Sequence, residues 1–241
     1  MIEIALIFVF AGTVKGIAGM GLPTIAIGLL GLFMPPGDAA ALIIVPSLTT
    51  NVWQFAAGPN RAGLLLRVWP MLLVMSAVTA AAAGLLTSSH AESAAIALGA
   101  VLMVYGAVGL ANLHPRVPRR MEAWLSPLVG AATGVVTGTT GVFVIPAGAY
   151  LQAIGLDKDE LIGALGLSFT VSALALAAGL AGRGAFHPAA AGASLLCTAP
   201  ALAGVLLGQW IRGKIDQQTF RQLFFLGLLL LGADLAVRTA L

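Results

Sequence analysis

The sequence has little charge for its length, and this excludes a water-soluble fold. Charged residues make up 9% of its 241 residues, whereas hydrophobic residues make up 59%. Soluble domains carry about 25% charged residues, because a fold of this size must keep a large wetted surface. The mean hydropathy is +1.01. The natural solvent for this chain is therefore a lipid bilayer.

Cysteine and histidine are scarce, which narrows the chemistry available to the chain. The single cysteine, Cys197, excludes an intrachain disulfide and a cysteine-based metal cluster. The three histidines, His90, His114 and His187, fall in predicted loops and form no metal-ligand pattern. The G-x-x-x-x-G-K-[ST] motif of nucleotide-binding loops is missing. We therefore expect no cofactor, no ATP-driven step and no enzymatic activity.

Basic residues are few and dispersed, which argues against a nucleic-acid partner. The net charge is only +3, and the basic residues lie mainly between apolar runs, where membrane topology uses them. The first apolar run has Glu3 as its only charge and lacks the positive start and small-residue cleavage site of a signal peptide. We expect this run to belong to the mature protein.

Apolar runs form two sets of five on either side of a basic joint. The first set comprises 2–16, 22–34, 38–57, 64–87 and 92–112, and the second 124–137, 141–155, 159–180, 188–211 and 219–239. The first two runs of each set would reach only about 20 Å as helices, against a hydrocarbon core of about 30 Å. The pattern predicts an all-α polytopic membrane protein with eight conventional transmembrane segments, or about ten helical pieces when broken helices are counted.

The two sets resemble each other and indicate an internal duplication. The segment GDAAALIIVPSLTTNVWQFAAG, from Gly37, aligns without gaps on KDELIGALGLSFTVSALALAAG, from Lys158. We therefore predict a first repeat over 1–112, a cytoplasmic joint over 113–123 and a second repeat over 124–241. Basic residues in the joint and in the 58–67 and 212–221 loops place these three on the cytoplasmic side. Five crossings per half then make the repeats inverted and put both chain ends outside.

Glycine-rich stretches interrupt the early runs of both halves, as GIAGMG in the first and GVVTGTTG in the second. Non-helical chain at membrane depth must line a cavity or be buried in protein, and paired interruptions are typical of transporter sites. Open helix N-termini favour anions, and glycine permits close approach. The candidate site glycines are Gly16, Gly19, Gly21, Gly138 and Gly141. The alternative is close helix packing, which the Gly12-xxx-Gly16 spacing fits directly.

Lys15 is the most distinctive residue of the first interruption. A lysine at the centre of a spanning helix costs at least about 2.5–3.5 kcal/mol on insertion scales. Lys15 could extend to the cytoplasmic interface, or it could face a cavity and bind an anionic substrate. The matching position of the second half carries Thr133 or Gly134, so a role for this charge would be asymmetric.

Polar side chains on the neighbouring helices supply the rest of a predicted lining. The candidates are Thr49, Asn51, Gln54, Thr137, Thr139, Thr140, Ser168 and Thr170. Hydroxyls and amides can donate to an anion, although Ser and Thr also bond back to their own helix. Asp38 and Asp159 each open an apolar run, and we interpret both as helix N-caps.

Four segments, taken in order, resemble one known family. They are GTVKGIAGMG, PPGDAAALIIVPSLTTN, GAATGVVTGTTGVFVIP and GLDKDELIGALGLSFTV. Together they resemble the TauE/SafE family of bacterial membrane transporters, the sulfite-exporter-like group. That resemblance implies movement of sulfur-containing anions across the inner membrane. The family's fuller G-x-G-G-G run is reduced here to Gly19-Met20-Gly21 and Gly138-Thr139-Thr140-Gly141, so no particular anion is indicated.

The sequence thus predicts a secondary transporter in the bacterial inner membrane. It would move a small sulfur-containing or organic anion, of the sulfite or sulfonate class, by alternating access. Expected partners are this anion and the lipid bilayer; a coupling proton and a homodimer are left open. Two alternatives also stay open, an intramembrane enzyme and a non-transporting membrane partner protein.

Overall fold

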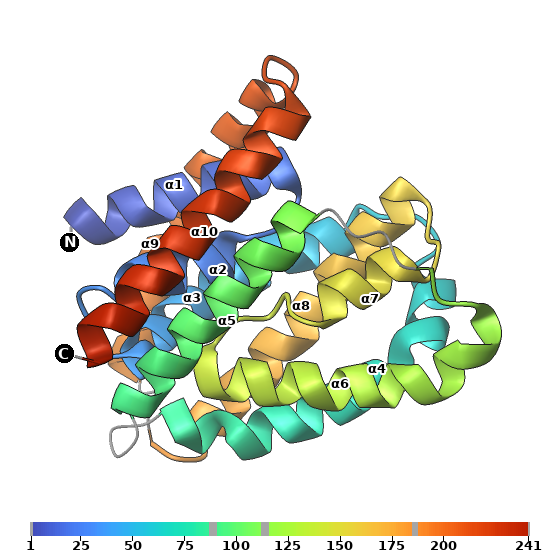
Figure 1. The fold of residues 1–241 in the computed structure, drawn as a ribbon, viewed down its shortest axis with the longest axis horizontal. Coiled ribbons are helices and arrows are strands. Elements are labelled where there is room, and N and C mark those ends of the chain that lie inside the picture. The colour runs from blue at the N-terminus through green and yellow to red at the C-terminus, as the bar shows by residue number, and fades with distance from the viewer. Residues whose placement is uncertain (1, 87–90, 112–115, 185–187, 241) are drawn as a thin grey trace.

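The computed structural model describes residues 2–86, 91–111, 116–184 and 188–240, and within these ranges the protein is entirely helical (Figure 1). The first half contains α1 (Ile2–Ala18), α2 (Leu22–Leu30), α3 (Pro36–Ala56), α4 (Arg61–Ala82), a 3-10 turn (Ala83–Leu86) and α5 (Ala91–Ala111). The second half contains α6 (Arg119–Thr140), α7 (Ala147–Ala153), α8 (Lys158–Ala181), α9 (Pro188–Arg212) and α10 (Gln217–Ala240). The ten predicted helical pieces are therefore present.

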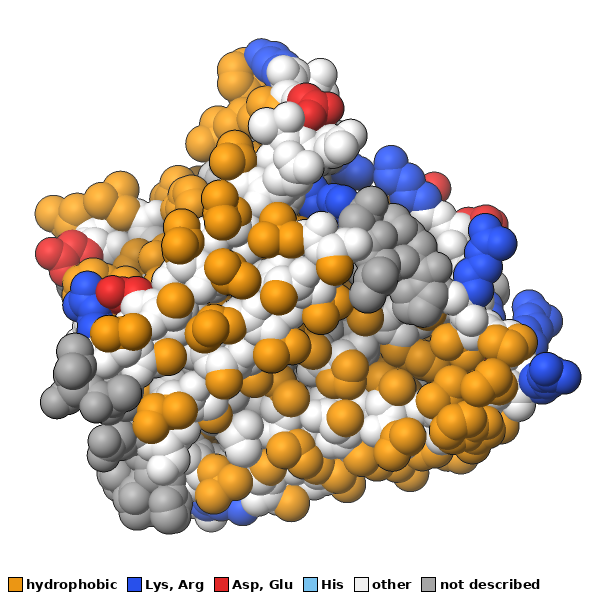
Figure 2. All heavy atoms as spheres, in the orientation of Figure 1, with side chains coloured by type: hydrophobic (Ala, Val, Ile, Leu, Met, Phe, Trp, Pro, Cys, Tyr) orange, Lys and Arg blue, Asp and Glu red, His pale blue; other side chains and the backbone are white. Residues whose placement is uncertain are grey.

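The surface and the helix lengths identify a multi-pass membrane protein. Six helices of the described ranges, α3, α4, α5, α8, α9 and α10, are long and apolar enough to cross a membrane. Figure 2 shows hydrophobic side chains spread over the whole visible face, with most charged side chains near its margins. Such a surface is stable in lipid and unstable in water. Residues 87–90, the three histidines and residues 113–115 of the joint lie outside the described residues.

The first predicted interruption is present where the sequence places it. Helix α1 ends at Ala18 and α2 begins at Leu22. Between them Gly19 and Gly21 have φ angles of 79° and 105°, a left-handed region that glycine enters without steric cost. The glycines therefore end one helix and allow the chain to turn into the next.

The second interruption starts later than predicted. Helix α6 continues through Gly134 and Gly138 and ends only at Thr140, so the expectation of broken chain from Gly134 onward is wrong. Gly141, with φ 73°, begins the interruption, and α7 follows at Ala147. The physical reason is packing: a β-carbon on Gly134 would lie 2.8 Å from the Met75 carbonyl oxygen of α4.

Small residues bring α1 and α9 into backbone contact. A β-carbon on Gly12 would lie 2.2 Å from the carbonyl oxygen of Ala201, and one on Gly16 would lie 2.3 Å from that of Val205. Both separations are shorter than real carbon–oxygen contacts. The same device joins α6 to α4, where a β-carbon on Gly130 would lie 2.4 Å from the Met71 carbonyl oxygen. Close glycine packing, the alternative interpretation of these glycines, therefore operates in both halves.

Helix contacts in the two halves correspond to each other. Helix α1 packs on α9 as α6 packs on α4, and α3 contacts α9 as α8 contacts α4. Helices α3 and α8 pack on each other, as do α5 and α10. Exchanging the first five helices with the last five reproduces each of these pairs. The start of α1 and the end of α10 lie on the same side of the molecule (Figure 1).

Pro46 interrupts the backbone hydrogen bonding of α3. Because proline has no N–H, the carbonyl group of Leu42 loses its normal partner within the helix. Ser194 of α9 replaces it, donating to the Leu42 carbonyl oxygen at 2.7 Å and accepting from the Val45 N–H at 3.0 Å. The serine thereby satisfies the backbone groups next to Pro46 and fixes α3 against α9.

Asp38 and Asp159 lie within the first turns of α3 and α8 rather than at their N-caps. The N-cap residues are Pro35 for α3 and Asp157 for α8, so the N-cap prediction is wrong by three and by two positions. Carboxylates in a first turn still stabilise the positive end of the helix.

Candidate functional site

Lys15 lies in the last turn of α1 with its side chain inside the protein. The residue is 4% exposed, so the side chain is buried among neighbouring helices and does not project from the protein surface. Its ammonium group donates to Thr50 Oγ1 at 2.9 Å and to Asn51 Oδ1, both on α3. A single turn of α3 therefore holds the ammonium group of α1.

The acceptors around Lys15 are neutral. In the part of the chain that the structure describes, the ion pairs are Arg67 with Glu122 and Arg238 with Asp234, and Lys15 takes part in neither. A buried charge without an opposite charge is unfavourable, because hydrogen bonds replace only part of its lost hydration. The site therefore has a deficit of one negative charge.

Asn51 provides a second unused group beside Lys15. The residue is fully buried, and its Oδ1 must face Lys15 because an ammonium group can only donate. Its Nδ2 then has no hydrogen-bond partner among the described residues, and neither does the hydroxyl of Ser47 one turn earlier. Buried polar groups are nearly always paired, so an unpaired donor next to an unpaired cation indicates a missing acceptor.

Gln54 fixes the first interruption against two other helices. Its Nε2 donates to the Gly19 carbonyl oxygen at 3.1 Å and to the Ile162 carbonyl oxygen of α8 at 2.9 Å. The Gly19 N–H in turn donates to the Lys15 carbonyl oxygen at 2.7 Å. The chain that carries Lys15 is thus held in place at its end.

A cavity of about 760 Å³ lies next to these groups, and we name it the Lys15 cavity. Lys15, Gly16, Gly19, Thr50 and Gln54 line one part of it, and residues of α9 line another. It extends to the loop at 57–59, with Asp159 and Arg212 also in its wall. A water molecule occupies about 30 Å³ in the liquid, so the cavity has room for a hydrated small anion.

The polar residues of the second half are bonded elsewhere. Thr137 donates to the Val142 carbonyl oxygen at 3.1 Å, and Thr140 accepts from the Val142 N–H at 3.2 Å. Ser168 is buried with its hydroxyl 3.9 Å from the Met75 sulfur. Thr137 and Thr140 therefore fix the start of the second interruption, and none of these three polar residues lines the Lys15 cavity.

The remaining predicted residues also lie outside the lining of the Lys15 cavity. Thr49, Thr139 and Thr170 donate to carbonyl groups of their own helices, at 2.9, 2.8 and 2.7 Å. Thr49 is exposed. Gly21 packs against Phe224, Gly138 against α4 and Gly141 against Ile27. The structure thus places Lys15, Gly16, Gly19 and Gln54 in the lining of the Lys15 cavity. Asn51 contacts Lys15 without lining the cavity, and the second-half residues are not part of this site.

A second cavity, of about 1060 Å³, receives residues from both interruptions. Met20 of the first and Ile145 of the second line it, together with Tyr105 of α5 and Phe224 and Phe225 of α10. We name it the aromatic cavity. The spacing of the aromatic residues on α10 is visible in the sequence. The helices that complete the cavity, α5 and α7, are distant from α10 in the chain.

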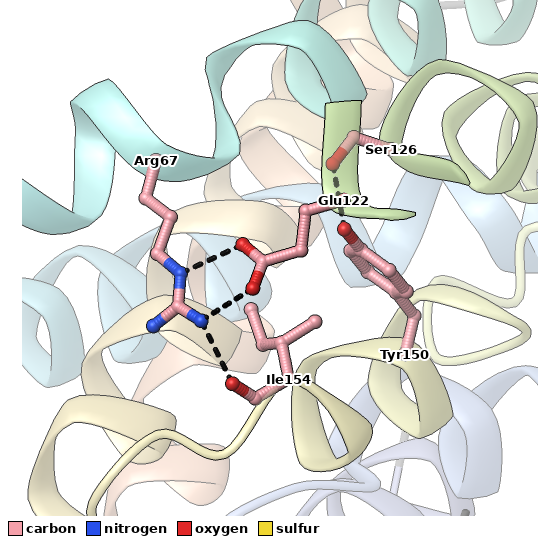
Figure 3. Close-up of polar contacts among 5 residues, drawn as sticks. All are labelled: Arg67, Glu122, Ser126, Tyr150 and Ile154. Atoms are coloured by element: carbon pink, nitrogen blue, oxygen red, sulfur yellow. Dashed lines mark hydrogen bonds and ion pairs between the residues drawn. The ribbon is translucent and has the colours of Figure 1, made fainter. Parts of the chain in front are cut away.

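An ion pair holds the short helix α7 against α4 and α6 (Figure 3). Arg67 donates from Nε and Nη2 to the two carboxylate oxygens of Glu122, at 2.9 and 2.7 Å, and from Nη2 to the Ile154 carbonyl oxygen at 2.7 Å. Ser126 and Tyr150 share a hydrogen bond of 2.7 Å beside it. These bonds anchor the segment that follows the second interruption.

The fold and these two cavities define a multi-pass helical membrane protein with interrupted helices beside buried polar groups. The family model described as Sulfite exporter TauE/SafE matches residues 4–235. The chain therefore belongs to the TauE/SafE family, as its motifs predict. No match was found among curated proteins or solved structures.

Proposed function

We propose that this protein is a secondary transporter of small sulfur-containing or organic anions, of the sulfite and sulfonate class. Membership of the TauE/SafE family supports transport of such anions. The observation that carries the proposal is Lys15, a buried ammonium group with neutral acceptors and no ion pair in the described chain. A bound anion supplies the missing negative charge.

The groups around Lys15 match the oxygens of such a substrate. Lys15 provides charge, and the unpaired Nδ2 of Asn51 provides a donor that needs an acceptor. Sulfite and sulfonate oxygens are acceptors, and charge-assisted hydrogen bonds to them are the stronger kind. A sulfonate would place its organic group in the rest of the Lys15 cavity, against the apolar residues of α9.

The two halves act as inverted repeats in this proposal. The corresponding helix contacts of the two halves support a duplicated architecture. With α1 and α6 added to the six candidate spans, eight long helices cross the bacterial inner membrane. Helices α2 and α7 return part of the way. The first repeat covers 1–112 and the second 124–241, with the basic joint 113–123 in the cytoplasm and both ends outside.

Alternating access follows from motion of one repeat against the other. The Lys15 cavity extends to the 57–59 loop, which this orientation places on the cytoplasmic side. Rocking of the first repeat against the second would close that route and open one from outside. Lys15 is also the group on which a coupling proton would be carried. A homodimer stays a prediction.

Equilibrium binding tests the site directly. Calorimetry of the purified protein in detergent should show saturable binding of sulfite or of a small sulfonate. The Lys15→Met variant should bind roughly 10- to 100-fold more weakly, from the strength of hydrogen bonds to charged groups. Lys158→Met, at an exposed lysine, is the matched control and should bind like the wild type. Absence of binding for every anion of the class would favour the partner-protein alternative.

A further inference from the structure

The aromatic cavity differs chemically from the Lys15 cavity. Tyr105 meets Phe224 and Phe225 edge to face, with ring centroids 6.4 and 5.2 Å apart, and Phe220 stacks on Phe224. The Tyr105 hydroxyl has a weak acceptor, the Met20 sulfur at 3.5 Å. This wall suits a hydrocarbon body better than a small hydrated anion.

Two arginines add positive charge to the same cavity. Arg116, from the segment before α6, and Arg221, from the first turns of α10, both line it. Gln152 of α7 contributes an amide group. Both arginines belong to the basic segments that mark the cytoplasmic side in the orientation given above. The cavity thus combines an apolar wall with cationic groups at the level of the inner headgroups.

The cavity is also accessible from the lipid-facing surface. Val104 and Val108 of α5 line it, yet these two residues are 55% and 48% exposed. They lie one turn apart in a helix long and apolar enough to span the membrane. A molecule in the surrounding bilayer can therefore reach the cavity between α5 and its neighbours without passing through water.

We propose that the aromatic cavity binds an anionic phospholipid of the cytoplasmic leaflet. Its headgroup phosphate would bind at Arg116 and Arg221, and one acyl chain would lie along the aromatic wall. Basic pockets between transmembrane helices on the cytoplasmic side bind anionic headgroups in this way. The inference uses the orientation of the proposed function but no property of the transported anion.

The bound lipid would contact both interrupted segments. Met20 precedes α2 and Ile145 precedes α7, and both residues line the cavity. Gly19, next to Met20, lines the Lys15 cavity instead. The first interruption therefore separates the two cavities, and the lipid stabilises the position of the chain that carries Lys15.

Native mass spectrometry of the detergent-purified protein with added lipid tests this inference. The wild type should retain phosphatidylglycerol in preference to phosphatidylcholine. The double variant Arg116→Gln/Arg221→Gln should retain about 30-fold less, from the contribution of two basic side chains to anionic-lipid binding. Arg119→Gln/Arg120→Gln, on the same basic segment but outside the cavity lining, should behave like the wild type.

A second pair of variants tests the apolar wall without changing charge. Val108→Trp should fill the cavity and reduce phosphatidylglycerol retention, whereas Val135→Trp, at a comparably exposed valine of α6, should not. An equal loss of phosphatidylglycerol retention in the two arginine double variants would overturn the proposal. Equal retention of the two lipids by the wild type would overturn it as well. So would retention of neither lipid together with saturable binding of hexanesulfonate, which would assign the cavity to a soluble anion. None of these measurements depends on transport.

Discussion

The ammonium group of Lys15 donates to the side-chain carbonyl of Asn51, and this one contact leaves the Asn51 amide nitrogen without a partner among the described residues. Two helices thereby present a cation and a hydrogen-bond donor at the same place. Both are buried. A protein that needed only stability would pair such groups internally, so their arrangement is better suited to an anionic ligand.

Removing the Lys15 charge should separate stability from binding. In Lys15→Met the side chain keeps similar length and the uncompensated charge disappears, but Asn51 Oδ1 loses its donor. These two effects offset each other, so stability without ligand should change by less than about 3 kcal/mol. Thermal melting in detergent measures this. Added sulfite or sulfonate should raise the melting temperature of the wild type only. A large destabilisation of the variant would show that Lys15 has a structural role instead.

Supplying an internal carboxylate should block the site. Asn51→Asp places a negative charge beside Lys15, so the ion pair should replace the substrate anion. We expect a more stable protein whose melting temperature no longer responds to sulfite. Asn51→Ser, which keeps a neutral acceptor, is the control and should retain a response. Undiminished anion binding by Asn51→Asp would contradict the placement of the substrate next to Lys15.

The α1–α9 contact should be sensitive to a single added methyl group. Gly16→Ala places a β-carbon 2.3 Å from the Val205 carbonyl oxygen, so the helices must separate. Overpacking of this kind costs about 1–3 kcal/mol. Gly192→Ala in α9, where a β-carbon would meet nothing within 4 Å, is the matched control and should not be destabilised. Equal melting temperatures for both variants would refute tight packing at Gly16.

The ion pair next to α7 should contribute more to the free energy of unfolding than the exposed ion pair in α10. Arg67 and Glu122 side chains are 22% and 12% exposed, whereas those of Arg238 and Asp234 are 65% and 43% exposed. Glu122→Gln leaves a guanidinium group partly unpaired, and we expect a loss of about 1–3 kcal/mol. Asp234→Asn should change stability by less than about 0.5 kcal/mol. Chemical denaturation of both variants in mixed micelles compares them, and equal losses would contradict the difference in burial.

Much of the architecture could be predicted because the bilayer restricts it. Unsatisfied backbone groups are excluded from lipid, so apolar runs had to be helices, and their breaks had to fall at glycine. Gly19 follows this rule. Gly138 lies inside α6 instead. A glycine that packs against a neighbouring helix and a glycine that ends its own helix look alike in sequence. The distinction depends on α4, which lies more than forty residues earlier in the chain.

The site was partly predictable for a similar reason. A lysine in an apolar run needs an explanation, and so do Asn51 and Gln54 within one helix of the same half. Which hydroxyls face them could not be predicted, because Thr49 and Thr50 are neighbours with opposite exposure. From the sequence alone, the arginines of the aromatic cavity indicate only membrane topology. Their approach to α5 and α7 is a property of the tertiary structure.

The central claim is that an anion crosses the membrane by binding at Lys15, and flux into liposomes tests it most directly. Purified wild type, Lys158→Met and Lys15→Met would be reconstituted at equal density, and uptake of labelled sulfite and of a labelled small sulfonate would be followed with and without a proton gradient. We predict uptake of at least one anion by the wild type and by Lys158→Met, and loss of that uptake in Lys15→Met. Normal flux through Lys15→Met would contradict the account.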